Sequence, residues 1–525
     1  MLEVCRRISA AISPLTSSRQ VTAIAFVITI LVAIGSLTWP MGEDHAYFFW
    51  VANVIPDGGI PYRDAWEQKG PLTYYIYAFA AMLFGSTDIA PRVLDLFAIV
   101  AGGLLLRKLV LRLNGNDVLG ANTASIVFLL AYYQWGFWNT ALPDEWGGIL
   151  LLLVILVLVD PPWSIRWTLA AAAGLVALAT LLKPTFLVFL LLPMAKALEP
   201  SIRRDNGAVP LFLCVLTFIS ATLLSLLVLL HGDLKDYWSV FRFQSSGYAP
   251  PRNVFHEITG LLPALYSVGL LVPFLLAPFG LWHIHRGSLR REALLVGIWF
   301  ALAVFVVALQ GRYVWPGHWG PAAFVICALF GVALSFLAIH LPDKHAEHWK
   351  ACAVALLTGL YIVAPWEHHD LLYNFRWPAY LLGFQQNESY RAYITSGEYY
   401  STLRAVSAYI EGHSTTADKV LVWGNELSIN VFSHRKSPTR FGYSLPLVLK
   451  GSVQEQFQKT FMKEVTADPP KYLVIDTGTP WFLTDRSGLQ LLEEFGPFFA
   501  FVHNRYRQVD TVGDFQILLV VGNSG

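Results

Sequence analysis

Ionisable side chains are concentrated in one aromatic-rich segment of the chain, which runs from Trp39 to Leu72. The segment reads WPMGEDHAYFFWVANVIPDGGIPYRDAWEQKGPL and carries Glu43, Asp44, His45, Asp57, Asp64, Glu67 and Lys69. A plain connector would not need these groups packed among so many aromatic residues. Carboxylates can accept protons and a lysine can hold an anion, so the segment predicts a reaction site.

Asp44 is the first candidate for proton transfer. It follows the long apolar run 21–38, so we expect it near the hydrocarbon boundary, where partial desolvation favours a carboxylate that accepts protons. The alternative is a helix cap, because Asp44 precedes AYFFWVANVI, a short apolar run that could form a surface helix. The pattern leaves both interpretations open, and they are not exclusive.

Glu67 and Lys69 stand just before a second apolar stretch, 72–84, and Pro71 suits its first helical position. A helix N-terminus beside a lysine predicts an anion site that can hold a phosphate at headgroup depth. An ordinary helix entry with a solvated lysine explains the same residues, and the spacing alone favours that alternative.

Further charged residues lie near the ends of other apolar runs. Arg92 and Asp95 are three residues apart and so share a helix face, which indicates either function or an internal salt bridge. Asp144 follows Pro143 at an expected helix start, where the helix dipole favours an acid without any function. Lys183 precedes Pro184 at an expected helix end on the outer surface, where the helix dipole favours a cation without any function.

The segment QGRYVWPGHWGP, 310–321, adds Arg312, Tyr313, His318 and Trp319. The fixed fork of an arginine suits phosphate, and a neutral histidine is a common metal ligand. A single histidine in a loop is more often structural, so His318 decides little by itself.

The composition shows what kind of chain positions these residues. Hydrophobic residues make up 55% of the 525 residues, charged residues only 14%, and the mean hydropathy is +0.50. Too little charge exists to cover several soluble cores, so we expect a membrane protein with a soluble minority. The net charge of +1 gives no electrostatic reason to expect nucleic acid as a partner. The four cysteines are scattered and predict no disulfide framework.

Eleven runs are long and apolar enough to be considered as transmembrane helices. They are 21–38, 91–111, 118–135, 144–160, 166–183, 184–199, 208–230, 258–282, 293–311, 319–339 and 351–366. No small-residue cleavage site follows the first run, so we expect an uncleaved anchor rather than a signal peptide. The stretch 72–84 has thirteen apolar residues and is too short to cross comfortably.

The distribution of lysine and arginine gives the orientation. If 72–84 lies flat on the membrane, the N-terminal side holds 15 basic residues in short segments, while the opposite loops hold seven. The positive-inside rule then places the N-terminus in the cytoplasm and all the candidate residues at the outer face. In a bacterium this would be the plasma membrane, with the site facing the periplasm.

The tail after about residue 367 has the composition of a soluble domain. Strand-like runs occur at 419–423, 471–475 and 515–521, and 483–495 resembles a helix. We therefore expect a transmembrane domain at 1–366, with the site in its first outer loop, 39–91. A small α/β domain at 367–525 would lie outside the membrane.

The first loop resembles that of the GT-C superfamily of membrane glycosyltransferases, in the branch with protein O-mannosyltransferases and lipid A aminoarabinose transferases. The resemblance rests on an ordered series across about fifty residues. The series is Glu43-Asp44, Asp57-Gly58-Gly59, Pro61-Tyr62-Arg63-Asp64, Lys69-Gly70-Pro71-Leu72, Phe84-Gly85 and Pro91-Arg92. Weaker matches are Pro143-Asp144, Lys183-Pro184, Gly311-Arg312-Tyr313, His318-Trp319 and the stretch 422–443.

This resemblance implies an inverting enzyme that moves a sugar from a polyprenyl phosphate in the outer leaflet to an acceptor hydroxyl. The acceptor would be a glycolipid, a polysaccharide or other glycan, or a protein. Asp44 would be the general base, and the residues around donor phosphate and acceptor would be Lys69, Arg92, Arg312, Tyr62, Asp64, Asp144 and Lys183. Glu67 and His318 would be ligands of a divalent ion such as Mg²⁺, Mn²⁺ or Zn²⁺, as in some relatives.

Two positions depart from the family pattern. His45 stands where a second acid is common, which weakens a metal site made of two carboxylates. Gly70 replaces the first proline of the usual Lys-Pro-Pro and loosens the geometry at Lys69.

Two other classes of function compete with a transferase. A transporter or lipid flippase also needs charge in the membrane, but it predicts two similar halves with broken spans and charges at midplane. A non-catalytic assembly protein would tolerate the loss of the Asp44 carboxylate, whereas a transferase would not.

Overall fold

The structure is a computed structural model that describes residues 18–248, 254–287, 289–310, 315–339, 343–363, 376–384, 399–478, 481 and 483–521. The chain divides into two compact units. Unit 1 comprises 1–38, 92–224 and 252–382, and unit 2 comprises 39–91, 225–251 and 383–525. The first loop was expected to belong with the helical domain, but the structure groups it with the C-terminal residues.

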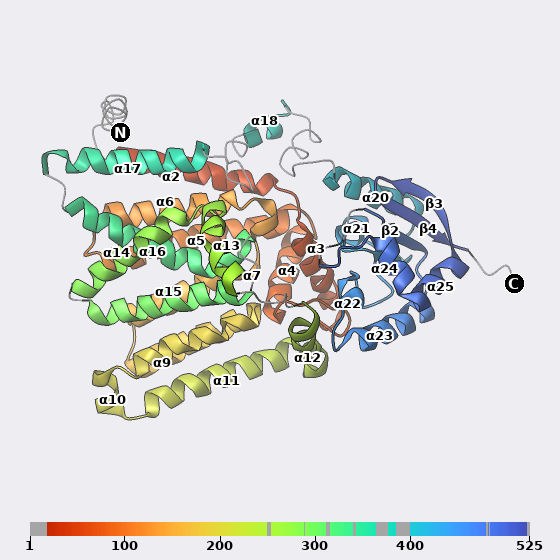
Figure 1. Cartoon of the computed structure of the whole chain (residues 1–525), viewed down its shortest axis with the longest axis horizontal. Coiled ribbons are helices and arrows are strands. Elements are labelled where there is room, and N and C mark those ends of the chain that lie inside the picture. The colour runs from red at the N-terminus through yellow and green to blue at the C-terminus, as the bar shows by residue number, and fades with distance from the viewer. Residues whose placement is uncertain are drawn as a thin grey trace. The chain divides into compact units, whose positions relative to one another are not determined.

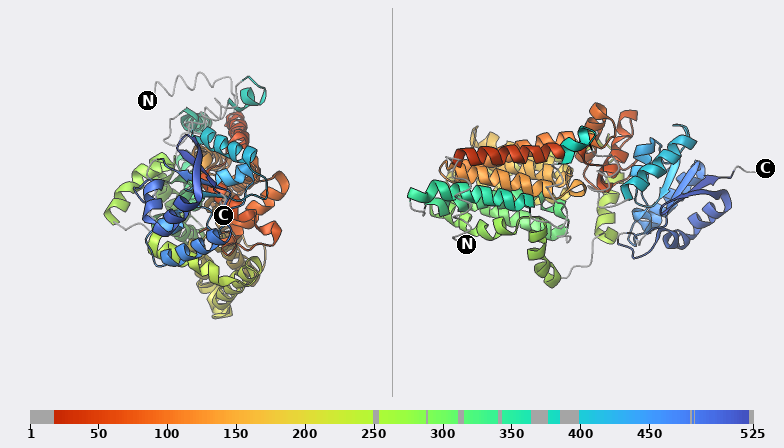
Figure 2. Two further views of the ribbon diagram at one scale, coloured as in Figure 1. Left: turned by 90° about the vertical axis from the view of Figure 1, so that its right-hand side faces the viewer. Right: turned by 90° about the horizontal axis from the view of Figure 1, so that it is seen from above.

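Unit 1 consists of helices, and its long helices run side by side (Figures 1 and 2). The α-helices are α2 (Ser18–Gly35), α5 (Ile89–Leu113), α6 (Val118–Gln134), α7 (Pro143–Val159), α8 (Ile165–Leu182), α9 (Leu191–Ala197), α10 (Pro200–Asn206), α11 (Val209–Leu229), α13 (Val254–Ser267), α14 (Leu271–Arg286), α15 (Arg290–Gln310), α16 (Gly320–Ile339), α17 (Asp343–Val363) and α18 (Trp377–Leu381). The 3-10 helices η1 (Ser36–Thr38), η3 (Phe137–Asn139), η4 (Pro184–Leu190) and η6 (Pro316–Trp319) connect them.

Within the described residues, six helices are long and apolar enough to cross a membrane, or up to eight if two bent helix pairs are counted as single spans. In the residues that the structure describes, all eleven predicted runs are mainly helical, and the chain is an integral membrane protein. Some expected spans are short, such as α6 with 17 residues, so eleven crossings stay a prediction.

The run 258–282 was expected to be one span, and the structure divides it into two helices; whether the pair makes a single crossing stays a prediction. The helices Gly260–Ser267 and Leu271–Arg286 are bent by 106° relative to each other. The break lies at Gly269, whose φ of 72° is left-handed and favours glycine. The amide of Leu270 donates to the carbonyl of Leu265, which closes a Schellman motif and ends α13.

Glycines bring the helices of unit 1 into close contact. A Cβ on Gly120 of α6 would lie 2.3 Å from the carbonyl oxygen of Gly331 on α16, and a Cβ on Gly280 of α14 would lie 2.0 Å from that of Leu329. Helix α16 is therefore a central packing element, and 83% of its apolar window is buried.

Unit 2 contains short helices of the first loop and an α/β domain. The first-loop elements are α3 (Glu43–Ala52), η2 (Ile55–Asp57) and α4 (Pro71–Phe84), and the middle segment adds α12 (Leu234–Phe243) and the π-helix η5 (Gln244–Tyr248). The C-terminal elements are α20 (Tyr399–His413), β1 (Val420–Trp423), α21 (Ser428–Ser433), α22 (Leu445–Val448), α23 (Gln454–Ala467), β2 (Tyr472–Asp476), α24 (Gly488–Glu494), α25 (Gly496–Arg505), β3 (Tyr506–Val512) and β4 (Phe515–Val520).

The described strands form one sheet in the order β1-β2-β4-β3 (Figure 1). Strands β1 and β2 are parallel, and the other pairs are antiparallel. Helices cover both faces of the sheet. Val406 of α20 packs with Val420 and Val474 on one face, and Trp423 packs with Phe495 and Phe498 on the other. The three predicted strands are confirmed, whereas β3 was missed because its residues alternate poorly and are mostly exposed.

Helix α4 corresponds to the predicted surface helix. Its 14 residues span about 21 Å, which is shorter than a hydrocarbon core of about 30 Å. Phe79, Met82 and Leu83 are at least half exposed on it. Its length and its exposed apolar side chains fit a helix at a membrane surface, and its orientation stays a prediction.

The close approach of α14 to α16 can be tested with two glycines. Gly280→Ala places a methyl group against the Leu329 carbonyl and should destabilise the protein by about 1–3 kcal/mol. Gly297→Ala in α15 is the matched control, because its Cβ meets side-chain atoms only at 3.5 Å and beyond; it should be neutral or stabilising by about 0.5–1 kcal/mol. Thermal unfolding of the detergent-purified full chain measures both, and equal melting temperatures would contradict the packing.

Candidate active site

Asp44 lies in the first turn of α3 but does not cap it. The N-cap is Gly42, and its amide donates to Nδ1 of the buried His45 at 2.8 Å. The imidazole thus takes the place that a glutamate usually has in a capping box. The capping interpretation of Asp44 is therefore wrong, and its carboxylate remains for other contacts.

Asp44 and Lys69 come together in unit 2. The Lys69 Nζ atom lies 3.9 Å from Asp44 Oδ2, and the two side chains are 15% and 33% exposed. Lys69 also lies over the ring of Phe48, 6.0 Å from its centroid. A long ion pair of this kind is weak and easily rearranged. The predicted base and the predicted phosphate ligand are thus neighbours at a partly open position.

The backbone of Lys69 is fixed by three buried side chains. Its amide donates to Glu67 Oε2 at 2.8 Å, and its carbonyl accepts from the hydroxyls of Tyr62 at 2.7 Å and Tyr74 at 3.1 Å. The single hydroxyl hydrogen of Tyr74 is shared between this carbonyl and Glu67 Oε2, which lies closer to the hydroxyl oxygen, at 2.6 Å. These bonds hold the peptide on both sides.

The Pro-Tyr-Arg-Asp motif builds the turn that supplies Tyr62. Asp64 Oδ2 accepts from the amide of Ile60 at 2.7 Å, and the Tyr62 amide donates to the Ala65 carbonyl at 2.7 Å. Tyr62 is fully buried and has a φ of 70°, and Arg63 pairs with Asp64 at 2.6 Å. Tyr62 and Asp64 were predicted to contact substrate; their described contacts are with the scaffold, and substrate contact stays a prediction.

Acidic groups surround the start of α3. Glu43 accepts a hydrogen bond from the hydroxyl of Tyr47. Burial raises the pKa of Glu43 well above its ordinary value, and the negative charge of Glu426 raises it further. Glu426 follows β1, so the C-terminal domain contributes charge to the surroundings of Asp44.

Trp66 joins the first loop to the C-terminal domain. Its amide donates to the carbonyl of Arg440 at 2.8 Å, and its indole Nε1 donates to Ser239 Oγ at 3.0 Å. The indole packs with Phe441 and Phe457 at centroid distances of 6.2 and 5.2 Å. The residue next to Glu67 is therefore positioned by both other segments of unit 2.

Asp144 and Lys183 come together in unit 1. Lys183 Nζ lies 2.8 Å from Asp144 Oδ1 and donates to Gln310 Oε1 at 2.8 Å. Both side chains are largely buried. The pair joins the start of α7 to the end of α8, and both residues were predicted site residues.

Arg92 and Asp95 each have other buried partners in unit 1. Arg92 donates to Thr140 Oγ1 at 2.8 Å and to the carbonyl of Phe137 at 2.7 Å. Asp95 accepts from the Tyr132 hydroxyl at 2.8 Å and from Trp146 Nε1 at 3.2 Å. Both residues thus brace the segment 137–146, and a role of Arg92 toward substrate stays a prediction.

Two other predictions gain no support from the coordinates. Arg312 lies outside the described residues. For the metal ion, the described residues contain no group of three or more His, Cys, Asp or Glu side chains that could hold one. Glu67 belongs to unit 2 and His318 to unit 1, and Glu67 Oε2 already accepts two hydrogen bonds. A divalent metal ion at this site therefore stays a prediction.

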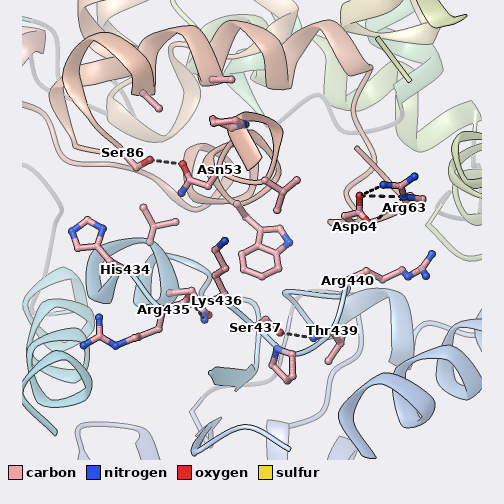
Figure 3. A pocket seen from close by; sticks show the side chains of 18 of the residues that line it. Asn53, Arg63, Asp64, Ser86, His434, Arg435, Lys436, Ser437, Thr439 and Arg440 are labelled. Atoms are coloured by element: carbon pink, nitrogen blue, oxygen red, sulfur yellow. Dashed lines mark hydrogen bonds and ion pairs between the residues drawn. The ribbon is translucent and has the colours of Figure 1, made fainter. Parts of the chain in front are cut away.

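A cavity of about 860 Å³ lies at the opposite end of α3 from Asp44 (Figure 3). Its rim carries the hydrogen-bonded pair Ser86–Asn53, the ion pair Arg63–Asp64 and the segment 434–440. Trp50 and Met82 add apolar surface. The lining includes both hydrogen-bond donors and acceptors, which suits a polyhydroxylated ligand, because each hydroxyl group both donates and accepts.

Sequence reasoning missed Trp66 and Tyr443 as residues that pack near Asp44 and Lys69. Tyr443 stacks on Tyr47 of α3 with a centroid distance of 4.5 Å. It closes the stretch 422–443 that carries the weaker family match, but nothing in the local pattern indicates a long-range contact with the first loop.

The sequence matches no family model and no curated protein. Among solved structures, ArnT from Cupriavidus metallidurans bound to undecaprenyl phosphate is similar, with a TM-score of 0.57 and 15% identity over 96% of this chain and 98% of that one. Its apo form gives a TM-score of 0.55, with 15% identity over 95% and 97% of the two chains. The chain therefore has the GT-C fold. An oligosaccharyltransferase from Archaeoglobus fulgidus follows with a TM-score of 0.49, 13% identity and coverage of 88% and 69%.

The buried Glu67 gives a test of the Lys69 anchor. Burial raises the pKa of Glu67 above its ordinary value of 4.5, against the opposing effects of Lys69 and the hydrogen bonds. The folded state therefore binds the proton more tightly than the unfolded state, and stability falls as the pH rises from about 4.5 through the raised pKa. Glu67→Gln keeps an acceptor oxygen, so at neutral pH it should match or exceed the wild type by about 1 kcal/mol.

This advantage should disappear when the pH is lowered toward 4.5, where both side chains are neutral in the folded protein. The measurement is the melting temperature of the purified full chain across this range. A variant that is less stable at neutral pH but not at acidic pH would refute the assignment.

Proposed function

We propose that the protein is a membrane glycosyltransferase that moves a sugar from a polyprenyl-phosphate donor to an acceptor hydroxyl at the outer face of the membrane. The observation that carries the proposal is the approach of Asp44 to Lys69 at 3.9 Å in a partly exposed position. The shared fold supports it, because ArnT was solved with undecaprenyl phosphate bound.

In this reaction Asp44 acts as general base. A carboxylate oxygen of Asp44 accepts the proton of the acceptor hydroxyl while the oxygen of that hydroxyl attacks the anomeric carbon. The bond from the anomeric carbon to the phosphate oxygen breaks, its electron pair stays on the phosphate, and the configuration inverts. The products are the glycosylated acceptor and the polyprenyl phosphate.

Lys69 stabilises the leaving phosphate. Negative charge develops on the phosphate oxygens in the transition state, and a fixed cation lowers the barrier most there. The anchored backbone of Lys69 sets the origin of the side chain, and the weak pair with Asp44 lets the ammonium turn to the phosphate without a large loss.

The other predicted residues take supporting roles in the proposal. Arg92 and Arg312 add positive charge toward the donor, and Asp144 with Lys183 forms a second charged pair for donor or acceptor groups. Tyr62 and Asp64 position Lys69 through their turn. The proposed reaction is written without a step through a metal ion.

The acceptor presents a hydroxyl group, and the cavity at the far end of α3 supports a carbohydrate portion. Asn53 and Ser86 offer both donors and acceptors there, and the volume lies in the range of ordinary ligand sites. We place the enzyme in the bacterial plasma membrane with the N-terminus in the cytoplasm and unit 2 in the periplasm, from the basic-residue count.

A transporter or flippase is the second candidate, because the two bent helix pairs are a feature that broken spans would produce. Against it, the candidate base and lysine lie in unit 2 with the α/β domain, whereas a transporter needs its charges on the spans themselves.

The proposed roles predict two separate losses. Asp44→Asn should lower turnover by about 10²–10⁴-fold, the usual contribution of a general base. Lys69→Met should lower it by about 10²–10³-fold, the usual effect of removing one group that stabilises a developing oxyanion. The assay follows sugar transfer from a lipid-linked donor in proteoliposomes.

Asp57→Asn is the matched control, because Asp57 lies in the same loop but is exposed and pairs with the exposed Lys436 at 2.6 Å. It should keep nearly full turnover. Full activity of Asp44→Asn in folded, membrane-inserted protein would refute the transferase mechanism.

A further inference from the structure

The hydroxyl group of Tyr443 is buried without a hydrogen-bond partner in the described part of the chain. The residue is only 2% exposed. Leaving a polar group unpaired in the interior costs about 1–3 kcal/mol, so folded proteins rarely tolerate it without a reason. A ligand that accepts a hydrogen bond is one such reason.

The position of Tyr443 connects the hydroxyl to the candidate active site. The ring stacks on Tyr47 with an angle of 17° between the planes, and it lies 6.3 Å from the ring of Trp66, the neighbour of Glu67. The carboxylates of Glu67 and Asp44 both act electrostatically on the hydroxyl. These two carboxylates flank Lys69, one at its amide and the other at its ammonium group.

The surroundings keep this hydroxyl a neutral donor. Burial raises the pKa of Tyr443 well above its ordinary value, and the negative charge of Glu67 adds to the effect. A neutral tyrosine with no acceptor among the described residues is able to donate to a bound molecule. Among the groups of the proposed reaction, the phosphate is the strongest acceptor that is placed beside Lys69.

We propose that the C-terminal domain takes part in catalysis, through a hydrogen bond from the Tyr443 hydroxyl to the phosphate of the lipid-linked donor. The proposal deepens the proposed function and rests on it for the identity of the ligand. Lys69 would supply the charge, and Tyr443 a neutral donor that adds no further charge beside Asp44.

The alternative is that Tyr443 is only an aromatic packing residue whose hydroxyl is tolerated. Both interpretations need the ring, because it packs between Tyr47 and Trp66. They differ in the hydroxyl alone, so Tyr443→Phe separates them while the packing is kept.

The test measures stability and phosphate binding together, on the full chain in detergent with undecaprenyl phosphate as the probe. Tyr443→Phe should melt at the same temperature as the wild type or higher, since it removes an unpaired buried group. It should bind undecaprenyl phosphate about tenfold or more weakly, the effect expected when a hydrogen bond to a charged group is lost.

Tyr506→Phe is the matched control. Tyr506 is a buried tyrosine of the same domain, and its hydroxyl donates to the carbonyl of Pro470 at 2.7 Å. Its removal should lower the melting temperature, because the carbonyl is left unpaired, and should leave binding of undecaprenyl phosphate unchanged. The two variants are therefore expected to show opposite patterns.

The outcomes separate this inference from the proposed function. If the wild type and Tyr443→Phe bind undecaprenyl phosphate equally, the inference is overturned and the function stands. A loss of stability in Tyr443→Phe as large as that in Tyr506→Phe also overturns it. If the wild type does not bind the probe at all, the donor class of the proposed function is wrong, and the inference is overturned with it.

Discussion

The anchoring of the Lys69 peptide is the constraint on which the rest of the site depends. A lysine side chain has many rotamers and cannot by itself fix where its charge is placed. The hydroxyls of Tyr62 and Tyr74 and the carboxylate of Glu67 hold the peptide, so the side chain starts from a defined point beside α3. Each of these groups is buried, and their own positions follow from the turn at Asp64 and from the start of α4. The short motifs of the first loop thus form one hydrogen-bonded structure, and this structure positions a single cation, Lys69.

Near the start of α3, acidic side chains outnumber basic ones. Glu43, Asp44, Glu67 and Glu426 all lie near the start of α3 or act on groups there, and Lys69 is the cation that contacts Asp44. An anionic substrate would be repelled by such surroundings if the acids were all ionised. Raised pKa values at Glu43 and Glu67 reduce that repulsion, because burial favours their neutral forms. The C-terminal domain participates in this balance through Glu426.

The sequence predicted local features and the structure supplied long-range ones. The apolar runs, the helix at Pro71, three strands and the neighbourhood of Asp44 and Lys69 follow from periodicity, turn residues and a motif series. The capping role of His45 was missed because an imidazole at that position is unusual. The sequence does place His45 three residues after Gly42, which is the usual spacing of a capping box. The bend at Gly269 was missed because a hydropathy window cannot see a single left-handed residue. The contacts of Trp66 and Tyr443 join residues more than 370 positions apart, and no local pattern records such a pairing.

The division of unit 2 among three stretches of the chain bears on how the protein is made. Residues 39–91 are synthesised before the helices of unit 1 at 92–224 and 252–382, whereas their partners in 383–525 are synthesised after those helices. Until then the indole of Trp66 lacks Phe441 and Phe457, and the amide of Trp66 lacks the Arg440 carbonyl. The contacts between the first loop and the C-terminal residues can therefore form only after the helices of unit 1 have been produced. A premature stop before residue 383 would leave a membrane-inserted chain whose first loop exposes aromatic side chains, a natural target for quality-control proteases.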